Sequence, residues 1–389
     1  MRLAGPARAI CFTSAAVALA CGGSEKKPIT AHPTSPPVAA SAPTAVDIYA
    51  ATGPNDLSPL VAHALFRVYV PNSASASVSV IDPTTYKVLR TFKVGAVPQH
   101  VVPAYDLGRL WVANDSGNSL TPIDPATGRE GPSVPVDDPY NLYFTPDGRF
   151  AIVVAEREHR LDFRDPQSMA LHDSVRVRCG GVDHMEFTAD GRSAIATCEF
   201  SGQLLKLDVA SHHVEGYLQL PADSIGHAMP QDVRSSPDGK VFYVADMTAD
   251  GVHLVDPDAF RVIGFIRTGR GTHGLYPSRD HRVLYVSNRG WNTIAGGQHG
   301  PGSISVIDFA TRRVIANWPI PGGGSPDMGN VTADGKELWL SGRYDGEVYV
   351  FDTATGTLTH RIRVQRGPHG LTVWPQPGRY SLGHTGNMR

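Results

Sequence analysis

The chain has 389 residues, of which 41% are hydrophobic and 19% are charged, and its formal net charge is −2. This composition allows a large buried core, and the near-neutral charge gives no indication of a surface for nucleic acid or an anionic membrane. The 40 glycines and 31 prolines are typical of a fold with many tight turns.

The first 21 residues have the features of an export signal. Arg2 and Arg8 make a basic start, residues 10–20 form an apolar run too short to cross a bilayer as a helix, and small residues precede Cys21. The segment resembles a bacterial lipoprotein signal with residues 18–21 (ALAC) as the lipobox, although leucine is commoner at its first position. The resemblance implies lipidation of Cys21 and an extracytoplasmic protein anchored to the cell envelope. An ordinary secretory signal cut nearby is the alternative.

The next segment, residues 22–64, is rich in Ser, Pro, Ala and Thr and has no periodic apolar pattern. This composition predicts a flexible tether. Residues 65–389 are predicted to form one folded domain. Since no other apolar run reaches 18 residues, the sequence predicts no transmembrane helix.

Residues 232–269 contain four runs rich in Val, Ile, Phe and Tyr, separated by turn sequences such as Pro-Asp-Gly. This pattern predicts four antiparallel strands. The unit recurs, and successive anchor residues at the start of each unit are spaced 41, 43, 48, 41, 55 and 41 residues apart. These anchors are His100, Asn141, His184, Asp232, His273, Met328 and His369. The period predicts an all-β fold, a seven-bladed β-propeller of four-stranded antiparallel blades.

The two ends of the chain contain incomplete units. Residues 65–94 supply strands two, three and four of a blade, and the segment after His369 supplies an inner strand, so the ring is predicted to close in one shared blade. Residues 65–72 and 379–384 compete for the second strand. We expect residues 65–72 to take it and the last ten residues to run along the surface.

Several motifs carry a family resemblance: PDGKVFYVAD, HRVLYVSN, GSISVIDFATRRVI and EVYVFDTATGTL. They resemble YVTN-type propeller repeats over about residues 65–375, and relatives of that family include the haem-binding propeller domain of bacterial nitrite reductase. The resemblance implies a propeller and suggests a haem over the channel mouth, held partly by histidine. The chain lacks Cys-x-x-Cys-His for a covalently attached haem, so we do not expect a full nitrite reductase.

Inner strands line the channel of a propeller, so the seven anchors are predicted to ring its mouth. Four of them are histidines, whereas 16 histidines in 389 residues would place about 0.3 there by chance. Converging imidazoles and a carboxylate predict a site for a transition metal such as Zn, Cu or Fe, or for a flat cofactor. The candidate metal ligands are His100, His184, His273 and His369. Alternatively, repeat duplication spread histidines that only cap strands or bond neighbouring blades.

Two long connections are predicted on the same face, residues 290–302 with Trp291 and residues 221–231 with His227. Since loops on a rigid scaffold often carry function, this face is the predicted ligand site. Arg289 and Arg343 are also predicted to be exposed there. The candidate ligand-binding residues are His100, Asn141, His184, Asp232, His273, His369, His227 and Trp291.

Cys179 and Cys198 are the only cysteines in the predicted folded domain. In an oxidising compartment such a pair predicts a disulfide. Thiolate ligands to a metal beside His184 are the alternative.

No nucleophile elbow, phosphate-cradling glycine loop or His-Glu-x-x-His motif is present. The sequence therefore favours a monomeric, non-catalytic binding scaffold of the cell envelope, with a small ligand or envelope protein as partner and membrane contact only through a lipid anchor. A metal- or haem-binding propeller with an oxidoreductase or cofactor-handling role is the alternative. A propeller lyase or lactonase ranks third.

Overall fold

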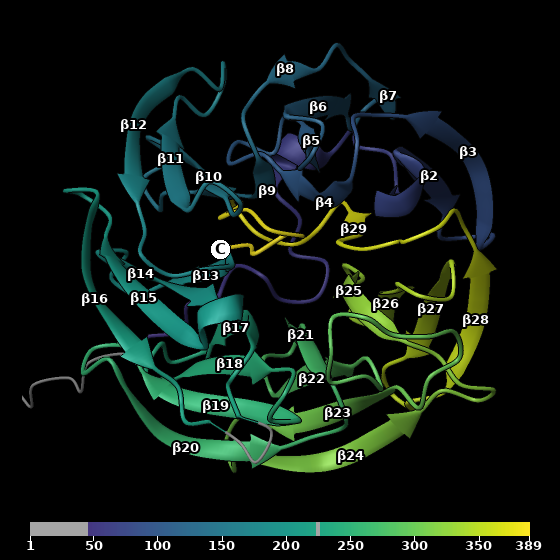
Figure 1. The fold of residues 1–389 in the computed structure, drawn as a ribbon. Helices are drawn as coiled ribbons and strands as arrows, with labels where there is room; N and C mark the ends of the chain where they lie inside the picture. Colours follow the sequence, from purple (N-terminus) through teal and green to yellow (C-terminus); the bar gives the residue numbers. More distant parts are fainter. Residues whose placement is uncertain (1–45, 223–225) are drawn as a thin grey trace, which may run out of the picture. The chain divides into compact units, whose positions relative to one another are not determined.

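A computed structural model describes residues 46–222 and 226–389, and these form one unit built from seven β-sheets (Figure 1). The predicted signal at residues 1–21 and the lipidation of Cys21 lie outside the described residues. Within the described ranges the only helices are three short 3-10 turns, η1 (Pro59–Val61), η2 (Ser73–Ser75) and η3 (Glu199–Ser201). None of the helices there has the length and apolarity needed to cross a membrane.

Each sheet is one antiparallel blade, with its inner strand at the channel. Blade 1 contains β29 (Thr372–Trp374), β1 (Arg67–Asn72), β2 (Ser77–Asp82) and β3 (Lys87–Lys93). Blade 2 contains β4 (Pro98–Pro103), β5 (Leu110–Asn114), β6 (Ser119–Asp124), β7 (Arg129–Glu130) and β8 (Val134–Pro135). Blade 3 contains β9 (Pro139–Phe144), β10 (Ala151–Ala155), β11 (Arg160–Arg164) and β12 (Leu171–Arg176).

The remaining blades follow the same order. Blade 4 contains β13 (Val182–Phe187), β14 (Ser193–Cys198), β15 (Gln203–Asp208) and β16 (His213–Gln219). Blade 5 contains β17 (Pro230–Ser235), β18 (Phe242–Asp246), β19 (Gly251–Asp256) and β20 (Arg261–Arg267). Blade 6 contains β21 (Thr272–Pro277), β22 (Val283–Asn288), β23 (Ser303–Asp308) and β24 (Arg313–Pro319). Blade 7 contains β25 (Pro326–Val331), β26 (Glu337–Gly342), β27 (Glu347–Asp352) and β28 (Leu358–Arg363). The predicted seven-bladed fold is confirmed.

Burial along the strands follows their place in the blade. Every residue of β13 is buried, because an inner strand is covered by neighbouring blades on both faces, whereas in β20 at the rim exposed residues alternate with half-buried or buried ones. The hydrophobic core therefore lies between successive blades. This packing joins the sheets into a closed ring.

The two ends of the chain meet in blade 1, where Val68 of β1 pairs with Val373 of β29. The prediction that the N-terminal segment supplies the second strand is confirmed. The prediction that the last ten residues run along the surface is wrong. Leu382, His384 and Thr385 are buried, and the segment passes into the channel, as the yellow trace crossing the middle of Figure 1 shows. Its backbone groups bond to the backbone of the inner strand β9, which holds the segment in the channel.

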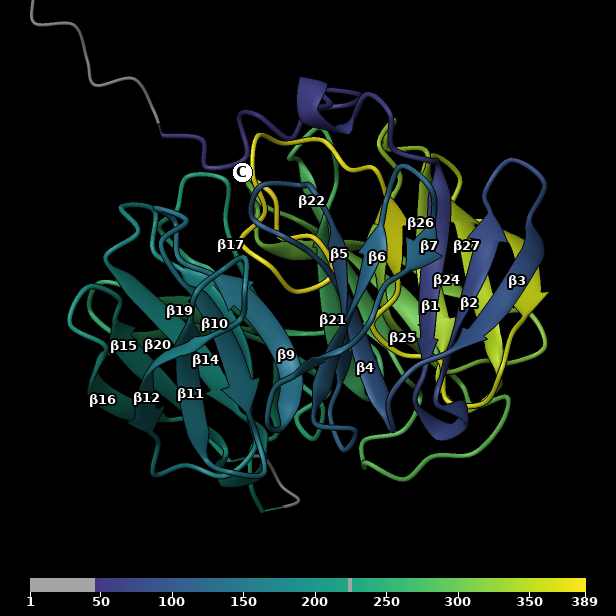
Figure 2. The ribbon, with the colours of Figure 1, turned by 90° about the horizontal axis from the view of Figure 1, so that it is seen from above.

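Residues 46–66 also differ from the expected flexible tether. Figure 2 shows this purple segment lying across one face of the propeller. Tyr49 is buried and its hydroxyl donates to the Ser235 carbonyl at 3.0 Å, and the Asn55 amide donates to the Ala333 carbonyl at 2.7 Å. The folded unit therefore includes residues 46–64, because these side chains and amides find partners on the propeller beneath them.

Candidate functional site

Each inner strand begins with an irregularity that decides which residues face one another in the channel. The pairing register of β13, β17, β21 and β25 is interrupted after the first residue and resumes at the fourth. The equivalent first residues, each paired with the last residue of a second strand, are Pro98, Val182, Pro230, Thr272, Pro326 and Pro368.

This register corrects the predicted ring of anchors. His100, His184 and Asp232 stand two residues after the first position, whereas His273 and His369 stand one residue after it. The anchors therefore belong to two successive rings rather than one. Sequence spacing missed the offset because a shift of one residue leaves the repeat length almost unchanged.

Three imidazoles meet inside the channel: His100 on β4, His184 on β13 and His384 on the C-terminal segment. One ring nitrogen of each lies within 4.8 Å of the others, and all three side chains are buried. The ring centroid of His384 is 4.8 Å from that of His184 and 5.1 Å from that of His100. His369 lies close by, with its centroid 4.9 Å from that of His100.

Hydrogen bonds at one ring nitrogen hold His100 and His369 in place and leave the other ring nitrogen of each without a partner among the described residues. His100 Nδ1 donates to the Tyr140 carbonyl at 3.0 Å, and His369 Nδ1 lies 2.6 Å from a carboxylate oxygen of Asp327. The Nε2 atoms of both rings, and both ring nitrogens of His184, have no hydrogen-bond partner among the described residues. A neutral imidazole held by one nitrogen presents a lone pair on the other, as in protein metal sites.

The imidazoles of this cluster are electrically neutral near pH 7. Burial is the main cause that lowers the pKa of His100, His184 and His384 well below the ordinary value, and the neighbouring imidazoles and arginines lower it further, because a second positive charge beside them is unfavourable. Since metal ions bind the deprotonated nitrogen, protons compete little at these three residues.

The C-terminal segment positions His384. The His384 amide donates to the Leu142 carbonyl at 2.9 Å, and His384 Nδ1 lies 3.0 Å from the Asn141 amide nitrogen. Gly383 has a φ of 101°, and a Cβ there would lie 2.3 Å from the Leu142 carbonyl oxygen, so only glycine allows this close approach.

Sequence reasoning missed His384 because it follows the last strand of the repeat. One signal was available: residues 380–388 contain no Lys, Arg, Asp or Glu, although the segment was expected at the surface.

Asp327 is the centre of a cationic cluster beside the imidazoles. Its carboxylate lies 3.1 Å from Arg289 Nε, 3.4 Å from His273 Nδ1 and 3.7 Å from Arg343. Burial alone would raise the pKa of Asp327, but the guanidinium of Arg289 and the imidazoles outweigh it and hold the pKa well below its usual range. Asp327 therefore keeps a negative charge that orients His369 and His273.

A second cluster contains three carboxyl groups, Glu156 after β10, Asp183 on β13 and Glu199 in η3. One oxygen of each lies within 4.8 Å of the others. Burial, followed by the charge of Glu199, raises the pKa of Asp183 well above its ordinary value and that of Glu156 to about 8. The carboxyl cluster is adjacent to the imidazole cluster along the chain, because Asp183 directly precedes His184 on β13.

The other predicted site residues have different surroundings. Asp232 is buried and pairs with Arg234 at 3.0 Å, and the Leu275 amide of the next blade donates to its second oxygen at 2.9 Å. His227 is exposed, and Trp291 is half-buried with its indole nitrogen donating to the Gly297 carbonyl of its own loop.

The structure thus brings six of the eight predicted residues into the channel and leaves His227 and Trp291 in their loops. Arg289 was predicted to be exposed and is buried, because it pairs with Asp327, whereas Arg343 is partly exposed.

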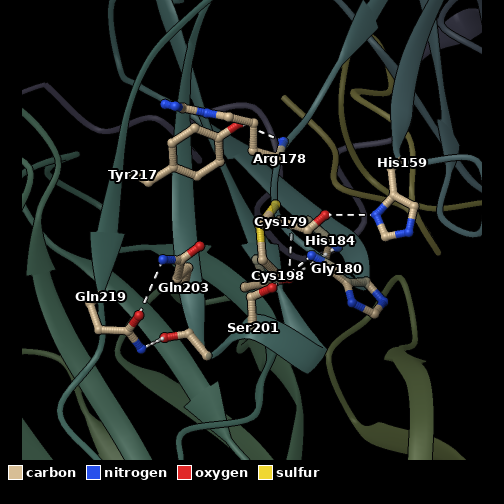
Figure 3. The surroundings of a disulfide bond; sticks show 12 residues. His159, Arg178, Cys179, Gly180, His184, Cys198, Ser201, Gln203, Tyr217 and Gln219 are labelled. Atoms are coloured by element: carbon tan, nitrogen blue, oxygen red, sulfur yellow. Dashed lines mark hydrogen bonds between the residues drawn. A yellow bond between two sulfur atoms is a disulfide. The ribbon is translucent and has the colours of Figure 1, made fainter.

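Cys179 and Cys198 form a disulfide with a Cα–Cα distance of 5.9 Å. Figure 3 shows that the bond joins the segment after β12 to the end of β14, and that the Cys179 carbonyl accepts a hydrogen bond from His159. The predicted disulfide is confirmed. The alternative, thiolate ligation beside His184, is wrong because both sulfurs are bonded to each other.

Comparisons with known proteins agree with this architecture. The model of a family described as "YNCE-like beta-propeller" matches residues 38–377. A 6-phosphogluconolactonase of Yersinia pestis (strain Pestoides F) is 24% identical over 274 residues, which are 65% of this chain and 79% of that protein.

Two solved structures show the same fold. Hydrazine synthase from Kuenenia stuttgartiensis has a TM-score of 0.58 at 20% identity, covering 70% of this chain and 88% of that one. Dihydro-heme d1 dehydrogenase NirN, in complex with DHE, has a TM-score of 0.59 at 15% identity, covering 81% and 75%.

Proposed function

This chain belongs to the YNCE-like β-propeller family, and we propose that within this fold it is a binding protein whose channel holds one transition-metal ion. The observation that carries the proposal is the cluster of His100, His184 and His384, buried together with free ring nitrogens. Duplication alone does not account for this cluster, because His384 lies outside the repeats.

Imidazole ligands suit Zn, Cu, Ni and Fe, and three of them leave coordination positions for a further ligand. A bound ion of this class supplies a Lewis-acid or redox centre. His100 and His184 would hold it through ring nitrogens that have no partner among the described residues, and the Tyr140 carbonyl orients His100. His384 would hold it through Nδ1, in place of the hydrogen bond that this atom accepts from the Asn141 amide. His369, already backed by Asp327, is the fourth imidazole within reach of the cluster.

A haem does not fit this cluster. The ring nitrogens lie within 4.8 Å of one another, and even a Cβ added at Gly370 would lie 2.1 Å from His100 Cδ2. The channel around the imidazoles is therefore close-packed, and a macrocycle has no room between these rings. The similarity to NirN, which was solved in complex with DHE, supports the fold and is not an argument for haem binding by this chain.

The test is metal stoichiometry in protein prepared without a histidine tag and offered Zn²⁺, Cu²⁺, Ni²⁺ or Co²⁺ one at a time. We expect about one ion per chain for at least one metal, and at least a tenfold loss of affinity in His100→Ala, His184→Ala and His384→Ala. His63→Ala, an exposed residue, is the matched control and keeps the ion. Wild-type protein that binds none of the four metals would overturn the proposal.

We further propose that the protein is exported and tethered through Cys21, with a small ligand or an envelope protein bound at the channel mouth. The disulfide supports an oxidising compartment. A Cys21→Ser variant is expected to leave the membrane fraction, whereas Cys11→Ser, within the same signal, remains there. Equal membrane association of both variants would contradict the lipid anchor.

The similarity to 6-phosphogluconolactonase favours a second candidate function, lactone hydrolysis. Its test is the rate of 6-phosphogluconolactone opening above the spontaneous rate, with Arg343→Met as the variant, because Arg343 is a partly exposed cation beside the channel. A rate increase lost in that variant would favour the hydrolase. The metal-binding proposal expects no acceleration.

A further inference from the structure

We infer that the mouth of the channel contains a second cation site, formed by Glu156, Asp183 and Glu199, which takes a hard divalent cation of the Ca²⁺ class. The site uses oxygen donors from blades 3 and 4 and does not depend on the imidazole cluster. One oxygen of each carboxyl group lies within 4.8 Å of the other two, which is close enough for one ion with Ca²⁺–oxygen distances of about 2.4 Å to contact all three groups.

The burial of Asp183 is a second observation that supports a cation site, in addition to the short distances among the three carboxyl groups. Its side chain is only 1% exposed, and apart from its contact with the Glu199 carboxyl group neither oxygen has a hydrogen-bond partner in the described part of the chain. Buried carboxylates in proteins are almost always paired or hydrogen-bonded, because removing an unpaired one from water is unfavourable. Asp183 is therefore a buried carboxyl group whose oxygens are available to a cation that lies between it and the two glutamates.

The protein supplies no cation of its own at this position. Within the described residues no Lys or Arg nitrogen lies within 4 Å of these three carboxyl groups, and the nearby Arg157 is engaged by Asp115 at 3.2 Å and Asp138 at 2.7 Å. The amide of Gln231 donates to Glu199 at 2.9 Å and fixes one carboxylate in place. The cluster is held together by neighbouring blades rather than by mutual attraction.

The donor set selects the class of ion. Carboxylate oxygens suit hard cations such as Ca²⁺, whereas imidazoles suit the softer transition metals. Glu156 is partly exposed at the mouth, which allows water to complete the coordination shell of a large ion, whereas Asp183 and Glu199 are buried. The two sites are thus predicted to fill with different ions.

The experiment is Ca²⁺ titration of chelator-treated, full-length protein, followed by calorimetry and by the thermal midpoint. We expect one Ca²⁺ per chain with a Kd on the order of 10⁻⁴ to 10⁻³ M, and a midpoint raised by a few degrees in 10 mM Ca²⁺. Asp183→Asn and Glu199→Gln should weaken binding at least tenfold while leaving the transition-metal stoichiometry unchanged. Glu158→Gln, an exposed acid two residues from Glu156, is the matched control.

Failure of the two proposals can be told apart. A protein that binds a transition metal at the histidines but shows no Ca²⁺ heat and no midpoint shift would overturn the carboxylate site alone. Equal Ca²⁺ binding by wild type, Asp183→Asn and Glu199→Gln would also overturn it, because the ion would then lie elsewhere. If either variant fails to fold, the other still decides the matter.

Discussion

The pKa values of the aspartates in this protein shift in opposite directions in the turns and in the channel, because their surroundings differ. Asp190 lies in a turn between β13 and β14, where the Thr188 hydroxyl at 2.7 Å is the largest cause that lowers its pKa to about 2. Asp232 lies in the channel, where burial raises the pKa to about 6 despite its pairing with Arg234. The repeat explains the first aspartate, since the same Ser/Thr-x-Asp contact recurs at Asp147, Asp238, Asp280 and Asp334.

The turn aspartates give a prediction for acid stability. The pKa of Asp190 is lower in the folded protein than its ordinary value of 3.8, so its stabilisation is present above pH 4 and is lost as the pH falls toward 2. Asp190→Asn should therefore lower the unfolding free energy at pH 7 by about 1 kcal/mol at most, because the side chain is half exposed and screened. The difference from wild type should vanish near pH 2 in urea unfolding. A difference that stays constant from pH 7 to pH 2 would contradict this assignment.

Among the connecting elements, the crossover between blades 3 and 4 is covalently fixed. Cys179 follows β12, Cys198 ends β14, and 19 positions separate them in sequence. The bond holds the segment that leads into β13, the strand that carries both Asp183 and His184. It therefore lies next to both proposed cation sites along the chain.

We expect the double variant Cys179→Ser, Cys198→Ser to lose about 2–4 kcal/mol of unfolding free energy, the range for a loop of this size. Guanidinium unfolding of the oxidised wild type, the reduced wild type and the double variant measures this loss. The last two should agree, since each lacks the bond. Identical midpoints for all three would show that the bond adds no stability.

The C-terminal segment is an element that the repeat pattern does not contain. Arg389 pairs with the buried Glu186 at 2.7 Å, and Asn387 donates to the same carboxylate. The Phe144 amide donates to the Leu382 carbonyl at 3.0 Å. The segment thus satisfies polar groups of the inner strands that would otherwise face an open channel.

Deletion of residues 380–389 should cost about 3 kcal/mol or more, because it leaves the Glu186 carboxylate buried without its partner. It should also expose the Phe144 amide to hydrogen exchange and remove the transition-metal ion. His384→Ala is the matched control, which loses the metal but keeps the Phe144 amide protected. Metal binding that survives the deletion would contradict the role of His384.

For the molecule as a whole, stability depends on closing the ring between segments far apart in sequence. Trp374 on β29 is buried against Tyr69 and Val78 of β1 and β2 in the same blade. This packing, together with the pairing of β1 and β29, leaves blade 1 without an exposed inner edge.

Trp374→Ala should lower the unfolding free energy by about 3–5 kcal/mol, the usual cost of such a cavity. We expect one transition, seen at the same urea concentration by far-UV circular dichroism and by fluorescence, because opening blade 1 opens the ring. Trp291→Ala, in a surface loop, is the control and should change the midpoint little. An early separate transition in Trp374→Ala would mean that blade 1 unfolds alone.

The channel shows where sequence reasoning reached its limit. The clustering of histidines at repeat starts predicted a site in the channel, and His100 and His184 belong to the imidazole cluster found there. The pairing shift within each inner strand then placed His273 and His369 one position away from them. No periodic pattern could reveal that shift, since it changes spacing by a single residue.

The seven blades and their closure by residues 65–72 could be predicted because every repeat restates the same strand periodicity and turn chemistry, and the disulfide could be predicted because the folded domain has two cysteines. The contents of the channel depend on the tertiary structure. His384 meets His100 and His184, and Asp183 meets Glu156 and Glu199, through contacts between segments up to about 280 residues apart. Local pattern carries no information on such contacts, since they arise when the ring closes and the C-terminal segment enters it.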